Sequence, residues 1–261
     1  MCQILFALDR HPRYPLVLAA NRDEFYARPS ARAAFWPDQP QLLAGRDLSA
    51  GGTWLGATRD GRWAAVTNYR QVTQNTAPRS RGELVTGFLC DNPDPADYLA
   101  SLLARADDYA GFNLLLGTLN GVWFADSRSR QIRRLEPGLH GLSNGELDND
   151  WPKVVEGKAR LAAALVDDEP DWAAIYALMT DREPAATERL PDTGIGLERE
   201  RALSAQFIVT PTYGTRCTTL LSRSTAGEIC FQEWGFGADG QAQERLAYRW
   251  QTGAPSLDQL R

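Results

Sequence analysis

The hydrophobic pattern of the chain begins with two short apolar runs that predict a pair of strands. QILFAL (3–8) and PLVLAAN (15–21) flank the proline-containing stretch HPRYP, which is typical of a β-hairpin with a long turn. Residues 22–40 contain three prolines and are predicted to be irregular. GGTWLGAT (51–58) and RWAAVTN (62–68) then predict two further strands joined by a tight turn.

Two stretches after residue 80 repeat apolar residues with the period of a helix. RGELVTGFLC (81–90) and PADYLASLLARA (95–106) each gather apolar side chains on one face. Asn92 or Asp94 is suited to cap the second helix. Strands are predicted again in FNLLLGTL, GVWFADS and QIRRLEPG, with Asn120-Gly121 as the hairpin turn between the first two.

The rest of the chain repeats this order of helices followed by strands. WPKVVEGKARLAAALV (151–166) and DWAAIYALM (171–179) have helical periodicity, and residues 181–203 are predicted to be a long surface loop. QFIVT, RCTTLLS, EICFQEWGF and RLAYRW predict the last strands. Because strand–helix–strand alternation is scarce, antiparallel sheets covered by helices are favoured over a parallel doubly wound sheet. We expect one domain over residues 1–261, since no repeat or low-complexity linker is evident.

Composition excludes several functional classes. The 261 residues carry a net charge of −5, so a nucleic-acid partner is not expected. The start has neither a basic segment nor an A-x-A site, and no apolar run approaches the roughly 20 residues of a membrane span. We therefore expect a cytoplasmic protein without stable membrane insertion. The four cysteines lack CxxC spacing, so no metal site is predicted and the thiols are expected to be reduced.

The scarcity of histidine restricts the candidate chemistry. Only His11 and His140 are present, and a mechanism that needs a histidine base must use one of them. Cys2 offers another route, because removal of Met1 would give it a free α-amine with a pKa of roughly 7.7–8.0. A thiol with its own base needs no histidine, which is the logic of N-terminal nucleophiles. The alternative is a buried cysteine that packs as a small hydrophobe.

The polar stretch NRDE (21–24) follows the second apolar run and is the next candidate. Arg22 can lower the pKa of a nearby thiol by stabilising the thiolate. Asp23 can hold the α-amine through a charge-assisted hydrogen bond. A solvated turn is the alternative interpretation.

Other polar and aromatic residues near predicted strands are weaker candidates when taken singly. Asn68 and Asn144 carry amides that can donate to an oxyanion, although asparagine is also a common turn residue. Arg216 precedes an apolar strand, where it can bind an anionic group or mark a strand edge. Trp36 and Trp54 lie among glycines and prolines and can line an apolar pocket, whereas most tryptophans belong to the core.

Many separate motifs together resemble one known family. They are MCQILFALDRHPRYPLVLAANRDEFYARP, FWPD, LAGRDLSAGGTWLG, VTNYR, RSRGELV, FNLLLG, GLSNGELDNDWPKV and YGTRCTTLL. In this order, from residue 2 to about residue 222, they resemble the NRDE family, which is also called the transport and Golgi organisation 2 family.

The resemblance implies an α+β fold, the four-layer αββα sandwich with antiparallel sheets of the N-terminal nucleophile hydrolases. Bile-salt hydrolase and penicillin acylase are of this type. Carried over residue by residue, it implies Cys2 as nucleophile, Arg22 and Asp23 as assisting groups, Asn68 as oxyanion amide, Asn144 as a second substrate-binding amide and Arg216 as a late active-site arginine. Those hydrolases space arginine and aspartate as R-N-x-D, whereas this chain has N-R-D-E, so an assignment shifted by one position stays open.

The expected function is hydrolysis of a linear amide or acyl bond of a small molecule by an N-terminal cysteine. Because the family is also linked to haem trafficking and to lipid or acyl-CoA homeostasis, a non-catalytic carrier that uses the same cleft is the alternative. No cofactor is required for hydrolysis, and haem is a candidate ligand whose axial partner is His11, His140, Cys2 or a tyrosine. The predicted ligand-binding residues are Asn21, Trp36, Trp54 and His140. A scaffold with a degenerate cleft is the third interpretation.

Overall fold

The computed structural model describes residues 2–70, 77–252 and 258–259. The chain divides into two compact units, each with its own antiparallel sheet and its own helices. The first unit comprises Met1–Ala27, Pro137–Gln251 and Pro255–Arg261, and the second comprises Arg28–Glu136 and Thr252–Ala254. The single domain expected over residues 1–261 stays a prediction.

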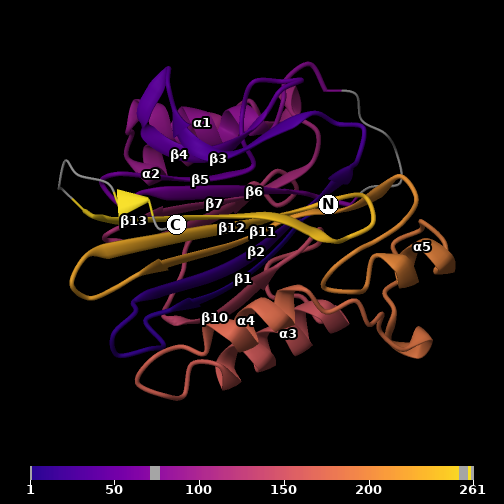
Figure 1. The fold of residues 1–261 in the computed structure, drawn as a ribbon. Coiled ribbons are helices and arrows are strands. Elements are labelled where there is room, and N and C mark those ends of the chain that lie inside the picture. The colour runs from indigo at the N-terminus through magenta and orange to yellow at the C-terminus, as the bar shows by residue number, and fades with distance from the viewer. Residues whose placement is uncertain (1, 71–76, 253–257, 260–261) are drawn as a thin grey trace. The chain divides into compact units, whose positions relative to one another are not determined.

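The sheet of the first unit is built around the predicted N-terminal hairpin. In sheet order its strands are β10 (Gly138–Leu142), β1 (Cys2–Leu8), β2 (Leu16–Phe25), β11 (Tyr213–Arg223), β12 (Glu228–Phe236), β13 (Ala242–Gln251) and β14 (Asp258–Gln259). Figure 1 shows the indigo strands β1 and β2 beside the orange and yellow strands from the other end of the chain. The first strands of the sequence are therefore central in this sheet.

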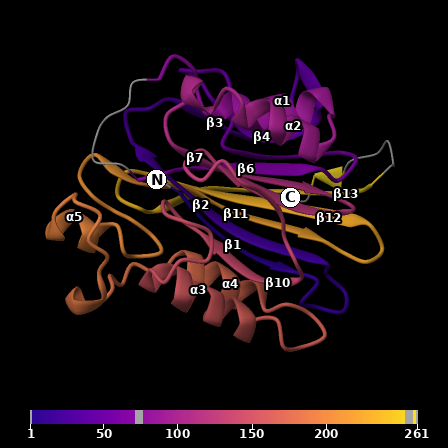
Figure 2. The same ribbon diagram turned by 180° about the vertical axis from the view of Figure 1, so that it is seen from behind.

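Two helices, α3 (Pro152–Ala163) and α4 (Trp172–Met179), cover one face of this sheet next to β1, β2 and β10 (Figure 2). The approach is close, since a Cβ added at Gly157 would lie 2.7 Å from Leu5 Cδ1 and would displace that side chain. The shared core is Leu5, Ala7, Val17, Ala19, Leu161, Ala164, Leu165, Ile175, Leu178, Met179 and Leu220. The odd-numbered residues of β1 and β2 thus face the helices, and the even-numbered ones face away.

The second unit is a meander in which each strand pairs with the next one along the chain. Its strands are β3 (Ser30–Trp36), β4 (Gln39–Asp47), β5 (Leu55–Thr58), β6 (Trp63–Asn68), β7 (Phe112–Thr118), β8 (Gly121–Asp126) and β9 (Ile132–Arg134). Between β6 and β7 lie α1 (Gly82–Asp91), α2 (Pro95–Leu103) and the short 3₁₀ helix η1 (Ala106–Asp108). Of the two predicted caps, Asp94 is the one that caps α2, by accepting from the backbone N–H groups of Ala96 and Asp97.

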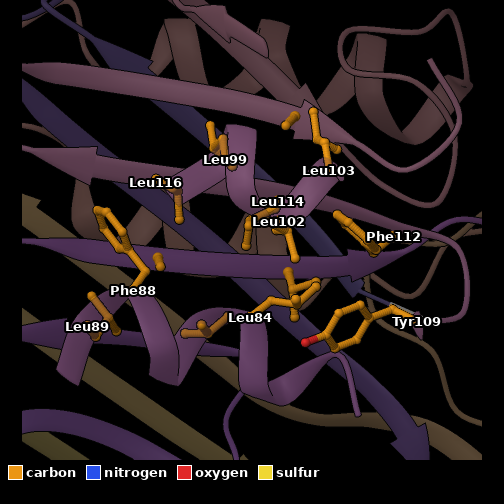
Figure 3. Close-up of a cluster of buried hydrophobic side chains, with 14 of the residues drawn as sticks. Leu84, Phe88, Leu89, Leu99, Leu102, Leu103, Tyr109, Phe112, Leu114 and Leu116 are labelled. Carbon is orange, nitrogen blue, oxygen red and sulfur yellow. The ribbon is translucent and has the colours of Figure 1, made fainter. Parts of the chain in front are cut away.

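The core of the second unit lies between its helices and its sheet (Figure 3). Leucines and aromatic rings from α1, α2 and β7 meet there: Leu84, Phe88, Leu89, Leu99, Leu102, Leu103, Phe112, Leu114 and Leu116. Each such buried side chain contributes about 1.5–3 kcal/mol relative to its exposed state. This cluster explains why the periodic stretches 81–90 and 95–106 fold as helices on this sheet.

The predicted helices and most of the predicted strands are confirmed, and the errors lie where turn residues obscured the pattern. Residues 22–40 contain the end of β2, all of β3 and the start of β4 rather than an irregular segment. Pro37 lies in the turn between β3 and β4, and Pro40 lies near the start of β4, where a missing N–H costs little.

Two further expectations about the second half of the chain were wrong in part. QFIVT is not a strand, and within it only Val209 forms an isolated bridge, with Gly214. Residues 181–203 are not a simple loop, because they contain the 3₁₀ helix η2 (Thr187–Arg189) and α5 (Leu197–Ala202). Within the described ranges, no helix is long and apolar enough to cross a membrane.

Candidate functional site

Strand pairing places Cys2, Arg22 and Cys217 in one row across three neighbouring strands of the first unit. Cys2 lies opposite Arg22, and Arg22 lies opposite Cys217. Residues opposite each other in antiparallel strands share a face, and here it is the face turned away from α3 and α4. The three residues are at most 9% exposed. A buried guanidinium is therefore flanked by two thiols.

Asp23 lies on the other face of β2, because successive side chains of a strand alternate. It is 1% exposed, and its Oδ1 accepts a hydrogen bond from Thr215 Oγ1 at 2.7 Å. Tyr213 OH donates to the backbone oxygen of Asp23 at 2.9 Å. The backbone of Asp23 also hydrogen-bonds Cys2. Asp23 therefore reaches the thiol through its main chain, whereas Arg22 shares the face of the thiol.

Burial raises the pKa of the Cys2 thiol above its ordinary value. The charge of Asp23 acts in the same direction, while the charge of Arg22 and the backbone of Asp23 lower this pKa without reversing the shift. Burial also raises the pKa of Cys217, and Glu233 adds to that effect. Both thiols are thus held in the neutral form at pH 7, so Cys2 needs a base in order to act as a nucleophile.

Lys153, the second residue of α3, is a site residue that sequence reasoning missed. It is 4% exposed, and its Nζ donates to the backbone oxygen of Leu203 at 3.2 Å. Burial raises the pKa of Asp23, and the charge of Lys153 is the strongest of the influences that oppose this rise. Its backbone oxygen accepts from Gln3 Nε2 at 3.0 Å and from Gln206 Nε2 at 2.8 Å. These bonds hold the start of α3 against β1.

The segment after β10 brings Asn144 to the same region. β10 pairs with β1 so that Leu142, its last residue, lies opposite Ile4. Ser143 Oγ donates to the backbone oxygen of Cys2 at 3.4 Å, and the Asn144 side chain is 1% exposed. The structure therefore brings together Cys2, Arg22 and Asp23, and it places the buried Asn144 directly after Ser143, which bonds to Cys2.

Arg216 lies at a β-bulge of β11, between Thr215 and Cys217. A bulge redirects the side chain of the extra residue. Here Arg216 Nη1 donates to the backbone oxygens of Phe25 at 3.0 Å and of Tyr26 at 3.2 Å. The guanidinium thus anchors the chain that leaves β2, and its predicted role in catalysis stays a prediction.

Asn21 is completely buried on the helix-facing side of β2. Its Nδ2 donates to the backbone oxygens of Met179 at 2.7 Å and Gln206 at 2.8 Å, and its Oδ1 accepts from Thr218 Oγ1 at 2.6 Å. Because both ends of the amide are engaged within the protein, this geometry favours a structural tie between β2 and α4 over contact with a ligand.

The remaining predicted residues lie apart from this group or in the second unit. Trp36 is buried in the core of that unit, where its Nε1 donates to Ala44 O at 2.9 Å, and Trp54 packs against the same cluster. This placement favours the core alternative for both tryptophans.

Asn68 is the last residue of β6, and its predicted oxyanion role stays a prediction. His140, on β10, is bonded to Asp148. Among the described residues, no group of three or more His, Cys, Asp or Glu side chains could hold a metal ion.

Replacing Arg22 is expected to slow the alkylation of Cys2. The charge of Arg22 lowers the thiol pKa, so Arg22→Met leaves less thiolate at pH 7–8, and the thiolate is the reacting form. We expect iodoacetamide to modify Cys2 several-fold more slowly, as measured by mass spectrometry of the peptide. Arg249→Met, on the exposed surface of β13, is the matched control and should react like the parent. Equal rates in the two variants would show that Arg22 does not influence the thiol.

Comparisons with known proteins show relatives of this chain. The family model for Transport and Golgi organisation 2 matches residues 1–237. The chain is 35% identical over 258 residues to a Transport and Golgi organization protein 2 homolog from Bos taurus, a match that covers 89% of this chain and 92% of that one. Its identity to the Homo sapiens homolog is 36% over 257 residues, with the same coverage.

A solved structure has the same fold at much lower sequence identity. The crystal structure of a C2A mutant of the conjugated bile acid hydrolase from Clostridium perfringens matches with a TM-score of 0.52 and 8% identity, covering 100% of this chain and 97% of that one. This likeness confirms the predicted fold class, an α+β fold with antiparallel sheets of the N-terminal nucleophile hydrolase type. From the family match and the curated relatives, the chain belongs to the Transport and Golgi organisation 2 family.

Proposed function

We propose that this protein is an N-terminal-cysteine hydrolase that cleaves a linear amide or acyl bond of a small molecule. The observation that carries the proposal is the place of Cys2, which begins β1 opposite Arg22 and is hydrogen-bonded by the backbone of Asp23. The conjugated bile acid hydrolase has the same fold. Its crystal structure is that of a C2A mutant, in which alanine replaces the cysteine at position 2 of that enzyme. The scarcity of histidine supports a base other than imidazole.

The proposed reaction begins with removal of Met1, a residue that lies outside the described ranges. The α-amine of Cys2 then accepts the thiol proton, and the thiolate attacks the carbonyl carbon while the carbonyl electrons move to oxygen. When this intermediate collapses, the protonated amine returns the proton to the leaving nitrogen and a thioester remains. Water, activated by the same amine, hydrolyses the thioester and releases the acid. An attached base explains how a thiol with a raised pKa reacts.

The neighbouring residues supply charge and hydrogen bonds in this scheme. The buried carboxylate of Asp23 holds the protonated α-amine through a charge-assisted hydrogen bond. Arg22 stabilises the thiolate from the same sheet face. The amide of Asn144 donates to the substrate or its oxyanion.

A non-catalytic carrier for haem or an acyl-CoA-like ligand is the second candidate. One observation favours it, namely that burial raises the pKa of Cys2 and so keeps the thiol neutral. A neutral, poorly exposed thiol is a small apolar surface and a weak nucleophile. A carrier would bind the same ligand classes without turnover.

Intact-mass measurement of the native protein tests the first step, and the expected mass is that of the chain without Met1. Retention of Met1 leaves the α-amine on the wrong residue and rules out the mechanism. The processed protein is then incubated with acyl amides of increasing chain length, and release of the amine is measured. Turnover supports the hydrolase. Binding of haem, seen as a Soret shift that is lost in Cys2→Ala, His11→Ala or His140→Ala, supports the carrier when no amide is cleaved.

A further inference from the structure

Asp148 closes the outer edge of the edge strand β10. Its backbone N–H donates to Gly141 O at 2.8 Å, and its Oδ1 accepts from the Gly141 N–H at 2.8 Å. These two hydrogen bonds pair the backbone N–H and C=O of Gly141 on the open edge of β10, as a neighbouring strand would. Asp148 has a φ of 62°, in the left-handed region that aspartate and asparagine tolerate better than most residues.

His140 and Lys158 hold the carboxylate of Asp148 in this position. His140 Nδ1 lies 2.8 Å from its Oδ2, and Lys158 Nζ on α3 lies 2.8 Å from its Oδ1. The His140 ring in turn packs on Phe6 of β1, with ring centroids 5.0 Å apart. Burial alone would raise the pKa of Asp148, but the bonds from His140, Lys158 and the Gly141 N–H hold it below its ordinary value. The carboxylate is therefore ionised at neutral pH and ties β10 to α3.

The chain between these anchors carries the residues next to Cys2. Gly141 precedes and Asp148 follows the segment that contains Ser143 and Asn144, so their pairing closes a short loop around it. Ser143 Oγ donates to the backbone oxygen of Cys2, and Asn144 is buried. Closing a loop removes conformational freedom from the residues inside it.

We propose that Asp148 is a positioning residue, which fixes Ser143 and Asn144 against Cys2 through its bonds to Gly141, His140 and Lys158. The proposal concerns the same site as the proposed hydrolase and extends that function by assigning the group that holds the Asn144 amide in place. Asp148 touches neither Cys2 nor the substrate in this role. It acts through the loop, so its loss should loosen the loop without changing the chemistry of the thiol.

Asp148→Asn is the sharpest test, because asparagine tolerates the same backbone conformation and its Oδ1 still accepts from Gly141. The negative charge seen by Lys158 is lost, and an NH2 group takes the place of Oδ2, the oxygen that faces His140 Nδ1. Asp150→Asn, at an exposed position of the same loop, makes the same charge change and is the matched control. Amide hydrogen exchange of residues 141–151 and alkylation of Cys2 by iodoacetamide are measured in both variants and in the parent.

We expect exchange in residues 143–148 to be at least about tenfold faster in Asp148→Asn than in Asp150→Asn, because hydrogen bonds to a charged group are lost. Cys2 should be alkylated faster with an unchanged pH dependence, since its access changes and its charged neighbours do not. His140→Phe keeps a ring on Phe6 and should give a smaller change in the same direction. If Asp148→Asn and Asp150→Asn behave alike in both measurements, the positioning role is wrong, whether or not the protein cleaves amides.

Where amide turnover is found, a double-mutant cycle tests the link to Asn144. Asp148→Asn should lower kcat/KM through Asn144, so the double variant with Asn144→Ala should be no worse than Asn144→Ala alone. Losses that multiply would show that Asp148 does not act through Asn144 and would overturn the catalytic part of the proposal. The exchange and alkylation measurements do not depend on turnover, so failure of the proposed function is recognised separately.

Discussion

Cys2→Ala is expected to lower acyl-amide hydrolysis by at least about 10³-fold, because removing a nucleophile leaves only binding and oxyanion contacts to assist water. The fold should survive, since the β1–β2 pairing is made by backbone groups and alanine is smaller than the buried thiol it replaces. We expect the free energy of unfolding to change by about 1 kcal/mol or less. The measurements are kcat/KM for a substrate found in the amide panel and a urea unfolding curve.

Two variants separate the role of Cys2 from that of a thiol in general. Cys230→Ala removes a half-buried thiol from β12 of the same sheet and should keep the parent rate. Cys2→Ser keeps a nucleophilic atom and the α-amine, so it should retain more activity than Cys2→Ala. Full activity of Cys2→Ala would place the nucleophile elsewhere and would remove the basis of the proposed hydrolase.

The part of this site that could be predicted from sequence is the part formed by local contacts. β1 and β2 follow each other with one turn between them, so their apolar pattern predicted the hairpin that brings Arg22 opposite Cys2. The stretch 22–40 was harder, because its prolines suggested an irregular chain while they actually lie in turns and near the start of a strand. Strand pairing outweighed the local turn signals there.

The long-range half of the site could not be predicted in the same way. Cys217 lies opposite Arg22 only because β11 joins β2 in a register interrupted by a bulge, and nothing near either residue specifies that register. The sequence could in principle have predicted that Arg22 and Asp23 lie on opposite faces of the sheet, because successive side chains of a strand alternate. It becomes clear only once β2 is known to extend to Phe25.

Lysine is rare in this chain, and the positions of its two lysines pointed to ionic interactions that the composition alone did not reveal. The chain has 28 Lys and Arg residues, and only Lys153 and Lys158 are lysines. Both lie on α3, Lys158 bonded to Asp148 and Lys153 beside the buried Asp23. The compact ammonium group of lysine has no rigid planar fork, so arginine does not replace it at a tight site. The two lysines on α3 thus mark one ion pair, with Asp148, and one charge that acts on the buried Asp23.

Lys153→Met is accordingly expected to lower the free energy of unfolding by about 3 kcal/mol at pH 7, because it leaves the buried carboxylate of Asp23 without its main opposing charge. Methionine has a similar length and fills the same volume, so most of the loss should be electrostatic. Urea unfolding measures it. Lys158→Met, the same change on the same helix at a more exposed ion pair, should cost roughly 1 kcal/mol.

The pH dependence and a second substitution identify the origin of this loss. Asp23 already has a raised pKa in the folded state, and loss of Lys153 raises it further. The unfolded chains of parent and variant titrate alike, so the two proteins diverge only as the pH rises through the raised folded-state pKa of Asp23 in the parent, where the parent ionises Asp23 and the variant still holds its proton. The difference should be largest at neutral pH and shrink as the pH falls toward about 4. Adding Asp23→Asn to Lys153→Met should restore most of the stability, since the uncompensated charge is then absent. A double variant as unstable as Lys153→Met at every pH would instead mean that Lys153 stabilises α3 by packing, and that the charge of Asp23 is balanced by other groups.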